Sequence, residues 1–191
     1  MSIPTNDRSK TMTTTIIDPT ASARRAAAST ASASPTVSEV NGLRIGLLEN
    51  TKRNAAQVLD AVGDVLVAQH GVGALVRRTK PQFSMPLTDE QVEDLLASCD
   101  AVVIGVGDCG SCSAAAVADG IALQQAGLPT AVICTEAFAQ TSRAMAAVKG
   151  DADFPFLTIE HPIANLGPAD IAARAAGVAG GVVRSLTGET R

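Results

Sequence analysis

The segment AVVIGVGDCGSC, residues 101–112, decides the fold of this chain. Its first six residues are apolar and largely β-branched, which is typical of a strand buried on both faces of a sheet. After Gly107 the sequence changes to DCGSC and then to a run rich in alanine, which indicates a helix. The segment therefore predicts a strand that passes into a helix at a pair of cysteines.

Cys109 stands at the predicted start of this helix. The first turn of a helix carries unpaired N–H groups and a partial positive charge, which favour the thiolate form of a cysteine. In open α/β sheets, ligands bind at the carboxyl ends of the strands. We therefore expect Cys109 to be a nucleophilic or redox-active thiol.

The rest of the chain alternates strand and helix patterns. Strands are predicted at residues 43–48, 74–79, 101–106, 130–135 and 155–160, and helices at residues 52–70, 88–98, 109–127, 138–150 and 168–186. Such alternation predicts an α/β fold: a single three-layer domain around a five-stranded, mainly parallel sheet with the flavodoxin-like order 2-1-3-4-5.

This domain is expected to span residues 41–191. Residues 1–40 are rich in Ser, Thr and Ala and are interrupted by Pro4, Pro19 and Pro35, so they are expected to form a mostly disordered or extended tail. The apolar pair Ile16–Ile17 is the part of the tail that could dock on the body.

Composition excludes several classes of partner. The net charge is -4, and the chain has no Trp, no Tyr and four Phe, so it offers neither a basic surface nor stacking platforms for nucleic acid. No apolar run is long enough to span a membrane, and the N-terminus lacks the apolar core of a secretory signal. We therefore predict a cytoplasmic protein without nucleic-acid or membrane partners, whose cysteines serve redox, catalytic or metal chemistry.

Polar residues gather where the predicted strands end. If the strands are parallel, one edge of the sheet collects the following residues: Glu49, Asn50, Lys52, Asp108, Cys109, Ser111, Cys112, Cys134, Thr135, Glu136 and His161. Chance would scatter them over both edges, so this convergence predicts a site. Cys134 lies within a strand pattern and is equally compatible with a core position. His161 fits either a general acid or a structural histidine.

No cofactor is expected at this site. The residues from Gly105 to Gly110 match G-x-G-x-x-G, but they follow the third predicted strand, and the pattern is weak alone. The first loop, ENTKRN, lacks a phosphate cradle for FMN, and the chain has few aromatic side chains to sandwich a flavin.

The sequence resembles the UGSC family of selenoproteins and their cysteine homologues, which are named for a Sec-Gly-Ser-Cys motif. Here the motif stands as Cys109-Gly110-Ser111-Cys112, with supporting matches at IIDPT near Ile16, RIGLLENTKRNA from Arg44, VICTEAF from Val132 and EHP from Glu160. The family is distantly similar to the selenoprotein subunits of glycine-reductase-type enzymes, in which a selenol attacks the substrate and a thiol resolves the product. The resemblance implies that Cys109 occupies the selenocysteine position and that Cys112 is its partner.

Our first hypothesis is a thiol-dependent enzyme, an oxidoreductase or a catalyst of reductive cleavage, acting on a small molecule. Cys109 attacks, Cys112 resolves the adduct to a disulfide, and an external dithiol such as a thioredoxin-like protein resets the pair. The expected catalytic residues are Cys109, Cys112, His161 and Glu136, and the expected substrate-binding residues are Glu49, Asn50, Lys52, Asp108, Ser111, Cys134 and Thr135.

Three alternatives stay open. Cys109, Cys112, Cys134 and His161 have the ligand chemistry for zinc or copper, although a second Cys-x-x-Cys is lacking. Cofactor-free acid–base chemistry would make the protein an isomerase or lyase. A thiol-supplying subunit of a larger homo- or hetero-oligomer would need no activity of its own.

Overall fold

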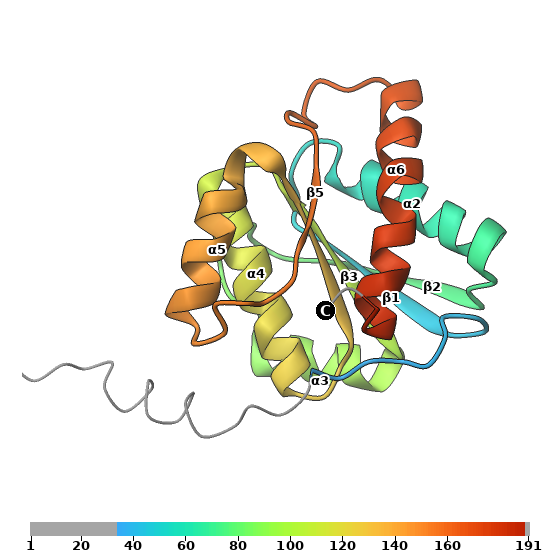
Figure 1. Ribbon diagram of the computed structural model, residues 1–191, viewed down its shortest axis with the longest axis horizontal. Coiled ribbons are helices and arrows are strands. Elements are labelled where there is room, and N and C mark those ends of the chain that lie inside the picture. Colours follow the sequence, from blue (N-terminus) through green and yellow to red (C-terminus); the bar gives the residue numbers. More distant parts are fainter. Residues whose placement is uncertain (1–33, 190–191) are drawn as a thin grey trace, which may run out of the picture.

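The computed structural model describes residues 34–189. The tail predicted for residues 1–40 therefore lies outside the described residues up to position 33. Residues 34–40 form neither helix nor strand, and they run past the C-terminal end of the last helix (Figure 1). There the Val37 N–H donates to the Leu186 carbonyl at 3.0 Å.

Five parallel strands form the central sheet in the order β2-β1-β3-β4-β5, which confirms the predicted order. Each strand falls within or overlaps one of the five strand patterns predicted from the sequence. Their bounds are β1 Arg44–Glu49, β2 Ala74–Thr79, β3 Ala101–Gly107, β4 Thr130–Thr135 and β5 Leu157–Ile159. All residues of β3 and β4 are buried, as expected for central strands covered on both faces.

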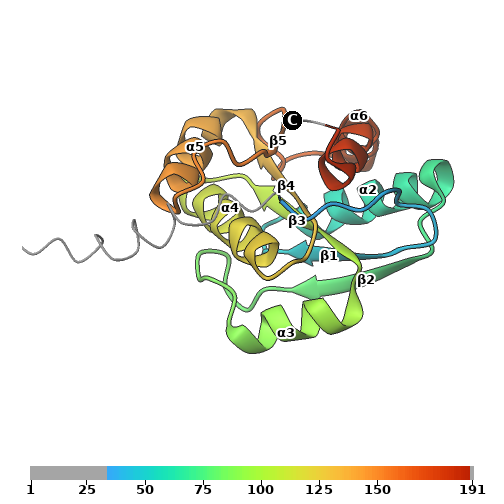
Figure 2. The same cartoon turned by 60° about the horizontal axis from the view of Figure 1, so that its bottom comes forward.

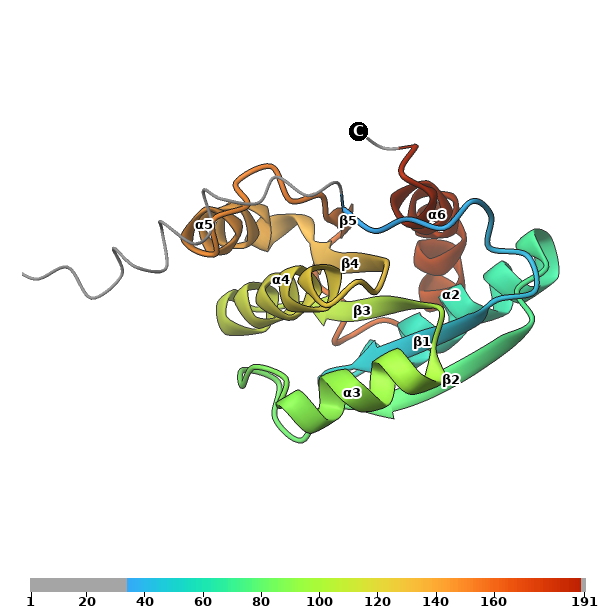
Figure 3. The ribbon, with the colours of Figure 1, turned by 90° about the horizontal axis from the view of Figure 1, so that it is seen from below.

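Helices cover both faces of the sheet. Their bounds are α2 Ala55–His70, α3 Asp89–Ser98, α4 Gly110–Gln125, α5 Ala139–Val148 and α6 Pro168–Thr187, and a short 3-10 helix, η1 Glu136–Phe138, precedes α5. Helices α2 and α6 lie together on one face, and α3, α4 and α5 lie on the other (Figures 2 and 3). Two apolar clusters, one on each side of the sheet, correspond to these layers.

Period-two alternation along the strands separates the two clusters. In β1, Ile45 and Leu47 belong to the cluster under α2 and α6, whereas Leu48 belongs to the cluster under α3, α4 and α5. Each of the three side chains is at most 2 % exposed. The apolar run thus supplies two cores at once, which is why this sheet needs helices on both faces.

Local signals in the sequence account for several helix ends. Helix α3 begins at a capping box in which the Gln91 N–H donates to Thr88 Oγ1 and the Thr88 N–H donates to Gln91 Oε1. Helix α6 has Pro168 in its first turn. Helix α2 ends at Gly71, whose φ of 70° is in the left-handed region that glycine adopts without strain.

Parallel pairing brings the loops after all five strands to one edge of the sheet. The same edge receives the beginnings of α2, α4 and η1. The ladder between β3 and β4 is irregular between Ile104 and Gly107, so β3 departs from regular pairing just before the cysteine pair. Among the described residues, no helix is both long and apolar enough to cross a membrane.

Candidate functional site

Cys109 is the N-cap of α4. Its backbone is extended, with φ -158° and ψ 167°, and its Sγ accepts a hydrogen bond from the Cys112 N–H at 3.3 Å. Its carbonyl accepts the Ser113 N–H at 2.9 Å. Small residues in GSCS let the chain pass from strand to helix within two residues, and the sulfur therefore takes the place of a capping oxygen.

Cys109 and Cys112 are joined by a disulfide, and their Cα atoms lie 5.2 Å apart. This separation falls within the usual range for disulfides, so one turn of helix suits the bridge without movement of the backbone. The two residues differ in access: Cys109 is half-buried, whereas Cys112 is 0 % exposed. An electrophile from solvent can therefore reach Cys109, with Cys112 directly behind it.

His161 is bonded to the residue that precedes the cysteine pair. Its Nδ1 lies 2.8 Å from Asp108 Oδ1 and 3.2 Å from Thr135 Oγ1, and Thr135 Oγ1 in turn donates to the Gly107 carbonyl at 3.3 Å. A carboxylate can only accept a hydrogen bond, so the tautomer that fits this pairing has its proton on Nδ1. Nε2 is then left to accept or donate a proton at the surface, where His161 is 35 % exposed.

Asp108 orients this histidine from below. Its side chain is 8 % exposed, and its second oxygen, Oδ2, accepts the Ile163 N–H at 3.3 Å. The Phe138 ring meets the imidazole edge-on, with centroids 5.4 Å apart. Asp108 thus fixes both the ring and the loop that carries it, and the ends of β3, β4 and β5 all contribute to one network.

Asn50 and Asn54 hold the first loop against this network. Asn50 is 2 % exposed, and its Nδ2 donates to the Val106 carbonyl at 2.9 Å. Asn54 adopts a left-handed conformation, with φ 66°, and its Nδ2 donates to the carbonyls of Ile163 at 2.8 Å and Leu166 at 3.1 Å. The segment ENTKRN therefore ties the loop after β1 to the loop after β5.

Cys134 lies beneath the site and is 0 % exposed. Burial raises the pKa of its thiol to about 11, so the thiol is neutral near pH 7. Gly107 lies between Cys134 and Ser113 and touches both. A Cβ on Gly107 would lie 2.8 Å from the Cys134 Sγ and 2.7 Å from the Ser113 Oγ. The structure thus places Cys134 in the core, away from solvent.

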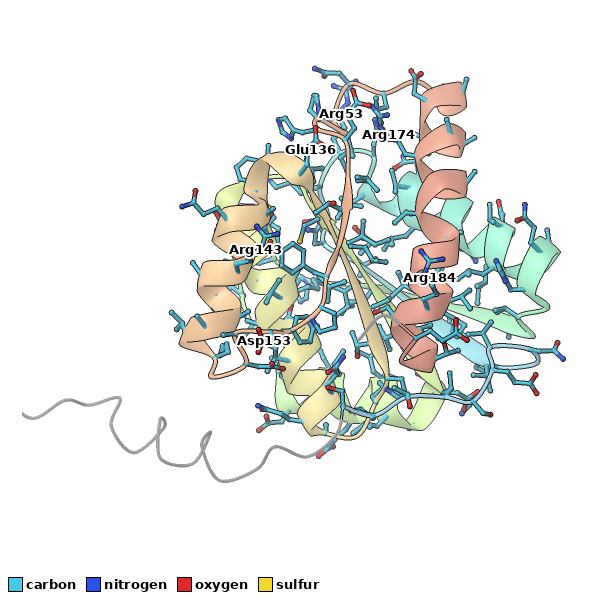
Figure 4. All side chains as sticks on the ribbon, in the orientation of Figure 1. Arg53, Glu136, Arg143, Asp153, Arg174 and Arg184 are labelled. Carbon is cyan, nitrogen blue, oxygen red and sulfur yellow. A yellow bond between two sulfur atoms is a disulfide. The ribbon has the colours of Figure 1, made fainter. Side chains whose placement is uncertain are left out.

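The remaining predicted residues lie around the same edge. Ser111 is exposed, with its Oγ 3.6 Å from the Cys109 Sγ. Glu49 accepts the Thr51 N–H, and the Lys52 ammonium lies 4.2 Å from the centre of the Phe83 ring. Glu136 opens η1 and shares this end of the molecule with Arg53 and Arg174 (Figure 4).

The contacts divide the predicted substrate-binding residues into two groups. Ser111, Lys52 and Glu49 are exposed or half-buried and accessible to a ligand, as is Glu136, which was predicted to be catalytic. The Asp108 side chain is 8 % exposed and serves through its bond to His161. Asn50, Thr135 and Cys134 are at most 2 % exposed and support the site from beneath. Among residues 34–189, no three side chains of His, Cys, Asp or Glu are grouped closely enough to hold a metal ion.

The sequence model of the UGSC family matches residues 15–188. This match covers nearly the whole chain, including strand β3, the Cys-Gly-Ser-Cys motif that follows it and the loops around that motif. The chain belongs to the UGSC family. None of the curated proteins compared with this UGSC protein matches it.

Three features of this UGSC protein were absent from the sequence prediction. Asn54 could have been recognised as a left-handed residue before a helix, since asparagine tolerates that conformation. Phe138 gave no signal, because its contact with His161 depends on the path of η1. Lys80 and Asp119 form a buried ion pair, and each is at most 2 % exposed; their separation in sequence hid the pair.

Proposed function

We propose that this UGSC protein is a thiol-dependent enzyme that reduces a small electrophilic molecule through Cys109 and Cys112. The observation that carries the proposal is the arrangement of the two sulfurs: a half-buried sulfur caps α4, and a fully buried one lies within bonding distance behind it. An accessible attacking thiol and a shielded resolving thiol are the two parts that dithiol reduction needs.

The first step consumes the Cys109 thiolate. It attacks an electrophilic carbon or heteroatom X of a substrate R–X–Y, so that an S–X bond forms and the X–Y bond breaks. The leaving group Y departs with the electron pair of that bond and takes a proton. The hydrogen bond from the Cys112 N–H and the start of α4 favour the thiolate that this step requires.

The second step forms the disulfide. The Cys112 thiol loses its proton and attacks the Cys109 sulfur, the S–X bond breaks, and R–X leaves with that electron pair and a proton. In total, two thiols give two electrons and two protons to the substrate, which becomes R–X–H and Y–H. An external dithiol, of the thioredoxin-like type, then reduces the disulfide and restores the starting state.

His161 is the proposed acid and base for these proton transfers. Because Asp108 holds the proton on Nδ1, Nε2 can take a proton from a thiol and return one to the leaving group. Asp108 acts as a positioning residue, since it touches the histidine through Oδ1 and the loop backbone through Oδ2.

The same Asp108–His161 pair favours a second candidate, cofactor-free acid–base chemistry by an isomerase or lyase. In that case His161 would move a proton on the substrate and the disulfide would play no part. The two functions differ in what becomes of the thiols: reduction consumes two thiols for each product formed, whereas isomerisation or elimination consumes none.

The test is a screen of the reduced protein against small electrophiles, including disulfides and small acids with a leaving group next to the carboxyl. Product and remaining free thiols are counted in the same sample, with Cys109→Ser as the matched control. We expect two thiols lost per product in the wild type and no product in Cys109→Ser. Turnover without loss of thiols would favour the acid–base function instead.

A further inference from the structure

A groove of about 530 Å³ runs between β5 and α6, and neither Cys109 nor Cys112 lines it. Strand β5 forms one wall, and it pairs only with β4, so its other edge is unpaired among the described residues. An unpaired edge offers backbone N–H and C=O groups to a further strand. The groove therefore has the form of a site for an extended segment.

Small residues of α6 form the opposite wall. Ala173, Gly177 and Gly181 recur every four residues, so they share one face of the helix and line the groove. A Cβ built on Gly177 would meet no atom within 4 Å, whereas one on Gly181 would lie 3.1 Å from Leu157. The groove is thus closed against β5 near Gly181 and open near Gly177, where an apolar side chain has room.

Two arginines of α6 give the groove a positive charge (Figure 4). Arg174 pairs with Glu160, but its Nε is buried and has no hydrogen-bond partner in the described part of the chain. Arg184 forms no ion pair with any residue in 34–189. An occupant with a carboxylate would complement both.

The chain outside the described residues begins beside this groove. Thr36 packs against Gly188 just beyond the end of α6, one turn past Arg184. The family match starts at residue 15, so it includes the segment TIIDPT, residues 15–20, which carries two isoleucines and Asp18. Thirteen residues lie between Thr20 and Ser34, and the fourteen Cα–Cα steps from one to the other span up to about 46 Å when extended. The groove follows about 15 Å of helix.

We propose that residues 15–20 of this chain dock in the groove as an added strand along the free edge of β5. Side chains alternate across a strand, so one of Ile16 and Ile17 faces the glycines of α6 and the other faces the opposite side of the sheet. Asp18 supplies the carboxylate for the arginines. A segment of the chain itself would thus occupy the groove, with Pro19 ending the added strand.

Hydrogen–deuterium exchange on the full chain tests the docking. The variant Ile16→Asp/Ile17→Asp is compared with Ser22→Asp/Ala23→Asp, which adds the same charge outside the segment. We expect amides of β5 and of residues 173–184 to exchange at least tenfold faster in the first variant and at the wild-type rate in the second. Unchanged exchange at β5, or equal acceleration in β1, would overturn the proposal.

Cross-linking identifies the occupant. Gly177→Cys is combined with Ile16→Cys or Ile17→Cys in protein carrying Cys109→Ser and Cys112→Ser, and Ser2→Cys replaces the isoleucine variant as the control. We expect an intramolecular disulfide from one of the two isoleucine positions and none from Ser2. A link found only between two chains would assign the groove to a second copy and overturn the intramolecular docking.

Discussion

The reactivity of the four thiols provides a quantitative prediction. Once the disulfide is reduced, iodoacetamide should label Cys109 first, because it is half-buried, whereas Cys112 is 0 % exposed. Cys134 should be slowest. With a pKa of about 11 in place of 9.0, its thiolate fraction near pH 8 falls about 100-fold, to about one molecule in a thousand. Burial also raises the pKa of Cys99.

The assay is pulsed labelling of the native, reduced protein at about pH 8, read by peptide mass spectrometry. Labelling in guanidinium chloride is the control, since unfolding removes the differences in burial and should bring the four rates close together. Labelling of Cys112 or Cys134 as fast as Cys109 in the native protein would refute the assignment of Cys109 as the attacking thiol.

Three further predictions concern the surroundings of the site. Lys80→Met should lower the free energy of unfolding, measured in urea at pH 7, by about 3–5 kcal/mol, because it leaves the buried Asp119 carboxylate without its partner. Burial raises the pKa of Asp119, so its protonation at lower pH should make this loss smaller. A loss that grows on acidification would contradict this. Gly107→Ala should destabilise the protein by about 1–3 kcal/mol, because the added Cβ would lie 2.7 Å from a buried serine hydroxyl. The control Gly110→Ala should change stability little, because its Cβ would meet nothing within 4 Å. Equal effects of the two substitutions would count against this packing. Asp108→Asn should lower kcat for thiol-dependent turnover about 100-fold with a changed pH profile, and an unchanged profile would deny Asp108 its positioning role.

The order of the strands was predictable because strand and helix patterns alternate along the chain, and five such units favour the order found. Strand β3 is buried on both faces and therefore reads as a continuous apolar run, and the switch at Gly107 marks where it ends. The prediction was less accurate for the fifth strand, where residues 155–160 were expected and only Leu157–Ile159 are paired. Strand β5 is an edge strand and pairs with β4 alone, and this pairing covers only part of the predicted segment.

The candidate site was predictable only in outline. Parallel topology brings Asp108, Thr135 and His161 to one edge, and their hydrogen bonds agree with that reasoning. Burial was harder to foresee, because it depends on packing between distant segments. Cys134 is buried because β4 is covered on both faces, and its strand pattern already allowed a core position. The close approach of Ser113 on α4 to Gly107 is a contact that no local pattern encodes.

The central claim is that Cys109 attacks and Cys112 resolves, and glutathione disulfide tests it without a known substrate. Reduced wild-type, Cys112→Ser and Cys109→Ser proteins are treated with it and analysed by intact mass and peptide mapping. We predict an internal disulfide without adduct in the wild type, a stable glutathione adduct on Cys109 in Cys112→Ser, and no adduct in Cys109→Ser. An adduct on Cys112 in Cys109→Ser, or a wild-type protein that keeps glutathione on Cys109, would contradict the account.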